Sequence, residues 1–458
     1  MTNNPPRPLI SKKSSGLLET APLLTQTQSP WRRWCVLLGF SLFSFSSALM
    51  WVAFAPCLYI FSHYYFGPDT TTTRTNAINC LSNIYMLLYP ILVQSTFPFF
   101  EDKGRAPGTG LKQGVLIGAV LNVVGAAIRW QGAFPSITGF AVLFLGQIMA
   151  AIAQVFMLAV PPRLAGAWFP ANEINLATSI AVSANNLGIA AGCVWTPLVV
   201  HTETMATDIP KLLFQQFLLA VAALVLLVLS LQRPAPNPTW SEEDIGNSRE
   251  QSKQLWKEFS FLYMLVAYGI LYGGQCAVVT LLAQILLPPF QGQITENYIG
   301  WLGFFTLFVG FPSSVAVGSY LDRAPRYRTM CIVLFVITAS SLIGLYLATE
   351  FRSLTAVTVS CLTFGLSSSA IGPALFQYAS ELYYPISELI PTGYLFTVGN
   401  IGGALLVAIM GWTENMETDF SMRIPVLCMA LINCACIYTI VKVDGPLKRS
   451  VALDSATS

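Results

Sequence analysis

The sequence carries little charge, and its long apolar runs carry almost none. Only 10% of the 458 residues are charged and 54% are hydrophobic, whereas soluble globular chains are about 25% charged. Charged residues lie at the ends of the runs or between them, and no acid, Lys, Arg or His stands in the interior of a run. Ionisable groups inside membrane spans are costly and usually serve as proton relays or counter-ions. Their absence argues against an ion-coupled mechanism.

Histidine is also scarce. The only two, His63 and His201, lie toward the outer ends of the spans, so no imidazole stands at mid-depth to bind haem iron. The spans show no acid–base pair, nucleophile–histidine pair or metal cluster, so we expect neither an enzyme nor a cofactor. All ten cysteines fall in or at the edge of the spans, which favours packing residues over a disulfide framework.

The apolar runs predict an all-α membrane protein of twelve transmembrane helices. About twenty apolar residues cross the hydrocarbon layer as a helix. If both termini lie on one side, 19 of the 24 Lys and Arg fall on that side, so the positive-inside rule places both termini in the cytoplasm. We place the spans at 35–62, 76–99, 113–129, 137–162, 174–200, 211–232, 259–288, 297–320, 328–349, 354–380, 389–413 and 424–442.

The chain divides into two halves of six spans each. The longest polar stretch between spans follows the sixth span, and its proline-rich start and mixed charge are typical of a linker. Weak repeats support a duplicated fold: Ala-Trp-Phe-Pro at 167–170 and Leu-Tyr-Tyr-Pro at 382–385 end the fourth and tenth spans. The predicted organisation is a disordered cytoplasmic tail 1–34, a six-helix bundle 35–232, a cytoplasmic linker 233–258, a six-helix bundle 259–442 and a cytoplasmic tail 443–458.

Charged turns stand at equivalent places in the two halves, after the second and the eighth span. Their acids, Asp102 and Asp322, are predicted to accept hydrogen bonds from helix N-termini, where anionic groups are favoured. The turns either reflect ordinary positive-inside topology or form a latch between the bundles on the cytoplasmic side. Arg163 and Glu381 are further gating candidates near the same side.

Amides in the spans are candidate binding groups. Gln147 and Gln154 are seven residues apart, so they share one face of the fourth span. Asn185 and Asn186 stand beside a glycine in the fifth span, and Asn400 stands between glycines in the eleventh. An amide in hydrocarbon needs a partner, so these side chains should face the bundle interior. They serve either to join helices or to bind a substrate.

Two aromatic residues extend this candidate site. Trp51 lies midway along the first span, although most membrane tryptophans lie at the interface. Its ring either packs against neighbouring helices or offers a cation–π surface to an ammonium group. Tyr85 of the second span could form part of the same wall.

The N-terminal tail contains a candidate sorting motif. Glu19, followed by Leu23 and Leu24, fits an acidic dileucine signal in a Ser-, Thr- and Pro-rich segment. We therefore expect an endolysosomal or vacuolar membrane, with the plasma membrane as the alternative, and a sorting adaptor as a possible partner of the tail.

Several stretches carry a resemblance to a known family. They are Arg32-Arg33-Trp34, residues 44–46 leading to Trp51, residues 146–154, 162–173 and 185–188, and Phe376 to Pro385. On these stretches the chain resembles the feline leukaemia virus subgroup C receptor family (solute carrier family 49), a branch of the major facilitator superfamily. The likeness extends over nearly the whole chain and is nearest to a less characterised third human member. It implies two pseudo-symmetric six-helix bundles around a midplane site.

The resemblance also implies a substrate class. Some members carry choline, ethanolamine or related amines, and haem or a vitamin B6 form has been proposed for others. Trp51 matches the family's first-span tryptophan and Gln154 its fourth-span glutamine. The eleventh-span glutamine falls at Asn400 and the seventh-span tyrosine at Cys276, which removes one ring of the expected aromatic cage. Tyr272, one turn earlier, could partly replace it.

These observations predict a transporter of a small neutral or monocationic organic solute. It would work by facilitated diffusion with alternating access, as a monomer in the lipid bilayer and without a nucleic-acid partner. Two alternatives stay open: a haem or vitamin B6-type transporter, and a non-transporting membrane receptor or scaffold.

Overall fold

The protein is built from α-helices and two short 3-10 turns in all the residues that the structure describes. The computed structural model describes residues 30–67, 72–102, 108–232, 248–290, 292–412 and 422–451. The N-terminal half contains α1 (Pro30–Val52), α2 (Leu58–Phe66), α3 (Thr72–Thr96), η1 (Phe97–Phe99), α4 (Thr109–Gln131), α5 (Ile137–Val155), α6 (Pro161–Trp168), η2 (Ala171–Glu173), α7 (Ile174–Val199) and α8 (Met205–Ser230). After the short helix α9 (Ser248–Leu255), the C-terminal half contains α10 (Phe259–Leu286), α11 (Glu296–Phe308), α12 (Gly310–Arg323), α13 (Tyr327–Glu350), α14 (Leu354–Leu382), α15 (Leu389–Trp412) and α16 (Arg423–Lys442).

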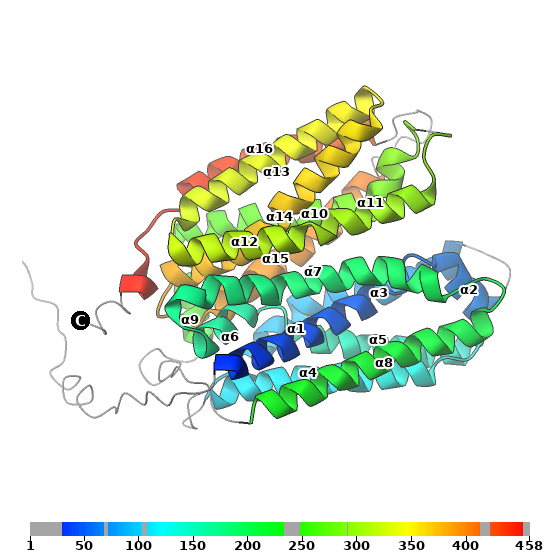
Figure 1. Ribbon diagram of the computed structural model, residues 1–458, viewed down its shortest axis with the longest axis horizontal. Helices are drawn as coiled ribbons and strands as arrows, with labels where there is room; N and C mark the ends of the chain where they lie inside the picture. The colour runs from blue at the N-terminus through cyan, green and yellow to red at the C-terminus, as the bar shows by residue number, and fades with distance from the viewer. Residues whose placement is uncertain are drawn as a thin grey trace, which may run out of the picture.

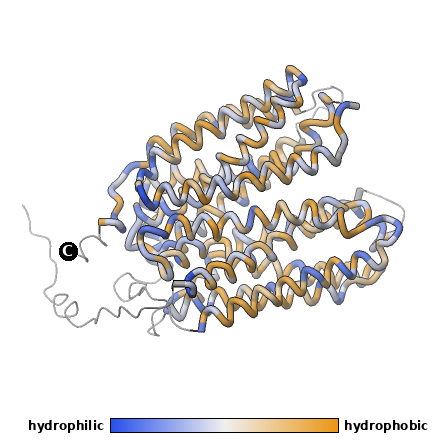
Figure 2. The backbone as a smooth tube through the Cα atoms, in the orientation of Figure 1, coloured by the Kyte–Doolittle hydropathy of each residue, from blue (hydrophilic) through white to orange (hydrophobic). Residues whose placement is uncertain are grey.

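The predicted number of spans is confirmed. Within the described residues, 12 helices or helix pairs are long and apolar enough to cross a membrane. Their hydrophobic lengths are separated by hydrophilic ends and connections (Figure 2). The protein is therefore a multi-pass integral membrane protein. Each α-helix satisfies its own backbone hydrogen bonds, as a segment in lipid must.

The two halves repeat the same helix pairings. In the N-terminal half α1 packs against α7, and α4 packs against α5 and α8. In the C-terminal half α10 packs against α15, and α13 packs against α14 and α16. The halves meet where α7 contacts α11 and α12 and where α3 contacts α15. This repeated pattern is the pseudo-symmetry expected from the sequence.

The halves are closest at one end of the molecule. We call this the terminal end, because the start of α1 and the last described turn of the chain both lie there, together with α6 and α9 (Figure 1). Toward the opposite end the helices of the two halves diverge (Figure 1). The side-chain hydrogen bonds between the halves, described below, lie at the terminal end.

Two expected spans are too long. The first was expected over 35–62, but α1 ends at Val52 and the separate helix α2 begins at Leu58. Pro56 lies in the break and has no N–H with which to continue a helix. The fourth was expected over 137–162, but α5 ends at Val155, and α6 begins with Pro161 and Pro162. The residues at both breaks are mostly apolar, like the helices on either side. In the sequence, therefore, only the prolines indicate that the helix ends there.

All ten cysteines are unpaired. Cys57 lies outside the membrane-spanning segments, between α1 and α2, and is buried. Burial raises the pKa of its thiol from 9.0 to about 11, so the thiol stays protonated near neutral pH and packs as a small apolar group.

Candidate functional site

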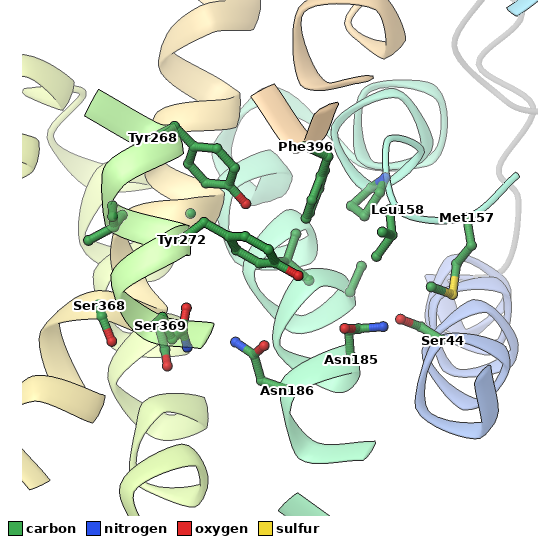
Figure 3. Close-up of a pocket in the computed structure, with 16 residues that line it drawn as sticks. Ser44, Met157, Leu158, Asn185, Asn186, Tyr268, Tyr272, Ser368, Ser369 and Phe396 are labelled. Carbon is green, nitrogen blue, oxygen red and sulfur yellow. The ribbon is translucent and has the colours of Figure 1, made fainter. Parts of the chain in front are cut away.

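A cavity lies between the halves, about midway along the helices that line it. Its walls come from α1, the α5–α6 connection and α7 on one side, and from α10, α14 and α15 on the other (Figure 3). Among the described residues that line it, none carries a formal charge. Its polar lining residues are Ser44, Asn185, Asn186, Gln275, Ser368 and Ser369, with the two tyrosines described next.

The C-terminal half contributes an aromatic wall, which we define as Tyr268, Tyr272 and Phe396. The two tyrosine rings stack with centroids 5.7 Å apart and an interplanar angle of 21°. Phe396 stands edge-on to both, at 5.8 Å from Tyr268 and 5.9 Å from Tyr272. Stacked and edge-to-face rings stabilise one another, so the wall presents a fixed aromatic surface (Figure 3).

Glycines bring the wall's two helices together. A Cβ at Gly402 of α15 would lie 2.5 Å from the carbonyl oxygen of Gly269 in α10. A Cβ at Gly399 would lie 2.9 Å from the ring of Tyr268. Only glycine allows so close an approach. The close packing places Phe396 of α15 against the tyrosines of α10.

The N-terminal half faces the wall with amides. Asn185 and Asn186 project from α7 toward the cavity, and Ser44 projects from α1 beside Asn185 (Figure 3). Gly188, one turn further along α7, packs directly on the backbone of Phe45, which keeps α1 and α7 in contact. The structure therefore brings both predicted asparagines into the cavity.

Trp51 and Tyr85 lie in the N-terminal half but are not among the residues that line this cavity. The Trp51 indole N–H donates a 2.9 Å hydrogen bond to the carbonyl oxygen of Ser82 in α3, and the Ser82 hydroxyl donates to the Trp51 carbonyl at 3.2 Å. Tyr85 is 1% exposed and packs in the same cluster as Met50. Trp51 is thus fixed to α3, and its role in binding stays a prediction.

The other three predicted binding residues also stand outside the cavity lining. Asn400 donates a 2.8 Å hydrogen bond to the carbonyl of Phe396 on its own helix. Cys276 lies one turn beyond Tyr272 on α10, with its sulfur 3.5 Å from where a Cβ of Gly403 would stand. Gln154 has a buried Oε1 without a hydrogen-bond partner. Their participation in binding likewise stays a prediction.

Several cavity residues were not singled out from the sequence. They are Ser44, Tyr268, Gln275, Ser368 and Ser369. A signal was present for the last three, because Gln275 is an amide within an apolar run and the two serines belong to the polar triplet 367–369 of the tenth span. Ser44 and Tyr268 carry no comparable signal, since single hydroxyls are common inside helices.

The two predicted latch acids lie at the terminal end. Asp322 of α12 accepts hydrogen bonds from the backbone N–H groups of Asn175 and Leu176, at 2.8 and 2.9 Å, and from the Asn175 side chain at 2.9 Å. These bonds cross from the C-terminal half to the start of α7, where the helix dipole favours an anion. Asp102 accepts from the backbone of Gly108 and Gly110 at the start of α4, within its own half.

Two other gating candidates also lie there. Arg163 is 6% exposed and donates to the Ser387 hydroxyl at 2.9 Å across the halves, and to the Phe100 carbonyl at 3.0 Å within its own half. Glu381 is 6% exposed and accepts from Ser450. The geometry of all four candidates is compatible with a latch, and that role stays a prediction.

Arg129 is a departure from the expected charge pattern. It was expected at the outer end of the third span, but α4 continues to Gln131 and Arg129 is 1% exposed. Its guanidinium carbon lies 5.0 Å from the centroid of the Phe54 ring, and its three side-chain nitrogens have no hydrogen-bond partner among the described residues. The N-terminal half therefore buries the Arg129 cation as well as Arg163, and the cation–π contact with Phe54 stabilises Arg129.

Glu19, Leu23 and Leu24 lie outside the described residues. The sorting motif that they form stays a sequence-based prediction.

The paired bundles and the central cavity are those of a membrane transporter. The Major Facilitator Superfamily matches residues 36–407, and the chain belongs to this superfamily. The chain is 28% identical over 392 residues to the human choline/ethanolamine transporter FLVCR2, covering 83% of this chain and 72% of that protein. It is 29% identical over 410 residues to solute carrier family 49 member A3 of Xenopus tropicalis, covering 87% and 80%. The resemblance to solute carrier family 49 is confirmed.

Three further comparisons complete this result. The chain is 29% identical over 391 residues to the uncharacterized MFS-type transporter C09D4.1 of Caenorhabditis elegans, covering 83% of this chain and 64% of that protein. Among solved structures, the transporter FucP in the outward conformation has a TM-score of 0.65 at 16% identity, covering 88% of this chain and 99% of that one. A bacterial homologue of the iron transporter ferroportin, outward-facing, has a TM-score of 0.68 at 14% identity, covering 90% and 99%. At these identities the structures show the fold alone.

Proposed function

We propose that this transporter carries a small organic cation of the choline and ethanolamine class by alternating access. The observation that carries the proposal is the aromatic wall facing Asn185 and Asn186 across one cavity between the halves. An ammonium group over a desolvated tyrosine face gains up to about 2 kcal/mol. The asparagine amides supply donors and acceptors for the hydroxyl group of such a solute. The curated relatives named choline/ethanolamine transporters support the same class.

Tyr272 takes the role of the missing cage ring in this proposal. The residue that matches the family's tyrosine is Cys276, but Tyr272 lines the cavity and is held in place by Tyr268. Trp51 is seven residues beyond Ser44 on α1, so both lie on one helical face. We propose that Trp51 contributes a second ring when substrate enters from the opposite end. Tyr85, Gln154 and Asn400 would then line the path around it.

The proposal includes the way the carrier opens and where it works. The terminal end is cytoplasmic. Asp322 and Arg163, whose hydrogen bonds cross between the halves, hold it closed. Asp102 and Glu381 stabilise the same end within their own halves. The carrier is a monomer in an endolysosomal or plasma membrane, with an adaptor on the N-terminal tail. Transport is uncoupled from protons, because no acid lines the cavity among the described residues.

Uptake by reconstituted vesicles tests the proposal. Radiolabelled choline and ethanolamine should accumulate in vesicles containing the protein, and Tyr272→Leu should raise the apparent KM by about tenfold or more, because the cation–π contact is lost. Tyr320→Leu is the matched control, since Tyr320 lies on α12 and is 45% exposed; it should leave uptake unchanged. Absence of uptake of either amine by a correctly folded protein would refute the substrate class, and strong stimulation by an imposed proton gradient would refute uncoupled transport.

A further inference from the structure

The chain does not end with the last membrane span. After α16, residues 443–451 fold back across the terminal end and finish in a short helical turn, drawn in red in Figure 1. Two contacts hold the start of this segment to the C-terminal half. The Tyr378 hydroxyl donates to the carbonyl of Val443 at 3.4 Å, and Arg328 forms a 3.5 Å ion pair with Asp444.

Ser450 anchors the far end of the segment. Its backbone N–H and its hydroxyl both donate to the same carboxylate oxygen of Glu381, at 3.0 and 2.8 Å. Glu381 stands near the end of α14 and is only 6% exposed. Hydrogen bonds to a charged acceptor are stronger than neutral ones. The pair of bonds therefore fixes the segment to the C-terminal half and gives a buried carboxylate its donors.

Arg449 makes the contact with the other half. It is 7% exposed, and its Nη2 lies 3.6 Å from Oε1 of Glu388 at the start of α15. A Cβ at Gly166, in α6 of the N-terminal half, would lie 2.5 Å from the same Nη2 and 3.3 Å from the Glu388 carboxylate. The guanidinium thus fills the seam between the halves, and glycine leaves the room that it needs.

We propose that residues 443–451 form a strap that holds the terminal end closed and so favours the state open at the opposite end. The strap is anchored to the C-terminal half through Glu381, and its Arg449 reaches Gly166 of the N-terminal half. When the halves separate at the terminal end, Gly166 moves away and the buried side of Arg449 loses its cover. The proposal rests on alternating access in the proposed function, but it does not depend on which solute is carried.

Hydrogen exchange measures closure without any substrate. The backbone N–H groups of Asn175 and Leu176 donate to Asp322 across the halves, so their exchange is slow only while the terminal end is closed. Ser450→Glu places a second carboxylate against Glu381. We expect exchange at Asn175 and Leu176 to become about tenfold faster or more, because two like charges at this distance repel strongly where water is partly excluded.

A matched substitution separates this effect from a simple change in net charge. Val451→Glu adds the same charge one residue further on, where the side chain is 63% exposed, and should leave the exchange rate as in the unaltered chain. Combining Ser450→Glu with Glu381→Gln removes the repulsion and should restore slow exchange. The rescue also shows that the glutamate side chain at position 450 does not itself disrupt the fold.

Three results would overturn the strap. They are unchanged exchange in Ser450→Glu, an equal effect of Val451→Glu, and failure of Glu381→Gln to rescue. Asp322→Ala removes the acceptor of these hydrogen bonds, so it gives the exchange rate of Asn175 and Leu176 when they are fully released. Against this reference a small change in rate can be distinguished from none. The readout contains no transport step, so a failure of the choline-class proposal leaves it valid.

Discussion

The removal of the Asp322 carboxylate should shift the conformational balance of the carrier. Asp322 accepts three hydrogen bonds of 2.8 to 2.9 Å from the start of α7, and all three cross between the halves. A hydrogen bond to a charged group contributes about 1.5–3 kcal/mol to stability. The carboxylate is only partly buried and is hydrated again when the halves separate. We therefore count about a third of the summed contribution of the three hydrogen bonds. Asp322→Ala should therefore destabilise the closed terminal end by about 2 kcal/mol, which is about thirtyfold in population.

Distances at the opposite end report this shift. Glu203 of the N-terminal half and Phe351 of the C-terminal half are both exposed, and both lie at the end opposite the terminal end. Spin labels on cysteines introduced at these two positions should show a long distance while the terminal end is closed. The exposed native cysteines 35, 80 and 428 are first replaced by serine. In Asp322→Ala a shorter distance should gain population.

Asp102→Ala is the matched control for this experiment. The hydrogen bonds that Asp102 accepts from Gly108 and Gly110 remain inside the N-terminal half. Its loss should cost about 1 kcal/mol of stability, as loss of a helix cap does, and leave the distance distribution as it was. An unchanged distribution in Asp322→Ala, or an equal shift in both variants, would refute the assignment of the latch to Asp322.

Three further predictions concern the site, the packing and the tail. Trp51→Ala should reduce choline uptake by tenfold or more with normal expression, since a desolvated cation–π contact contributes up to about 2 kcal/mol; retained uptake would remove Trp51 from the site. Gly402→Ala should lower the melting temperature, because the new methyl group meets the backbone of α10, at a cost of about 1–3 kcal/mol. Gly300→Ala, where nothing lies within 4 Å, should not lower it. Changing Leu23 and Leu24 to Ala should move the protein to the cell surface, and fluorescence microscopy showing an unaltered location would contradict a sorting role.

Hydropathy predicted the number of spans but not where helices break inside them. The bilayer requires about twenty apolar residues for each span, and every span that it requires can be read in the sequence. The breaks after Val52 and Val155 keep the apolar character of their surroundings, so their only local signal is proline. Arg129 was misplaced for a related reason. It ends an apolar run and was therefore expected at the outer end of the span, but the helix continues past it and the Arg129 side chain is buried.

The sequence predicted only part of the candidate site, and it did so from one kind of signal, an amide within an apolar run. Asn185 and Asn186 stood out because an amide in an apolar run needs a reason, and both line the cavity. Tyr268 and Phe396 form the wall with Tyr272, yet aromatic residues are so common in these spans that neither was distinctive. Their relevance comes from the close packing of α10 on α15, which depends on contacts between residues more than a hundred positions apart. A single sequence does not show which faces of two such distant helices pack together.

The uncharged cavity has a consequence for the driving force. A proton-coupled carrier needs a carboxylate that both sides reach in turn, and the acids Asp102, Asp322 and Glu381 are instead hydrogen-bonded to backbone and side chains at the terminal end. An uncoupled carrier of a cation still responds to voltage, because each unit charge gains about 2.3 kcal/mol per 100 mV across the membrane. A neutral solute gains nothing from the same potential. Accumulation of choline against its gradient in vesicles with an inside-negative potential, and without a pH gradient, is therefore the behaviour that an uncharged, aromatic-walled site requires of a monocationic substrate.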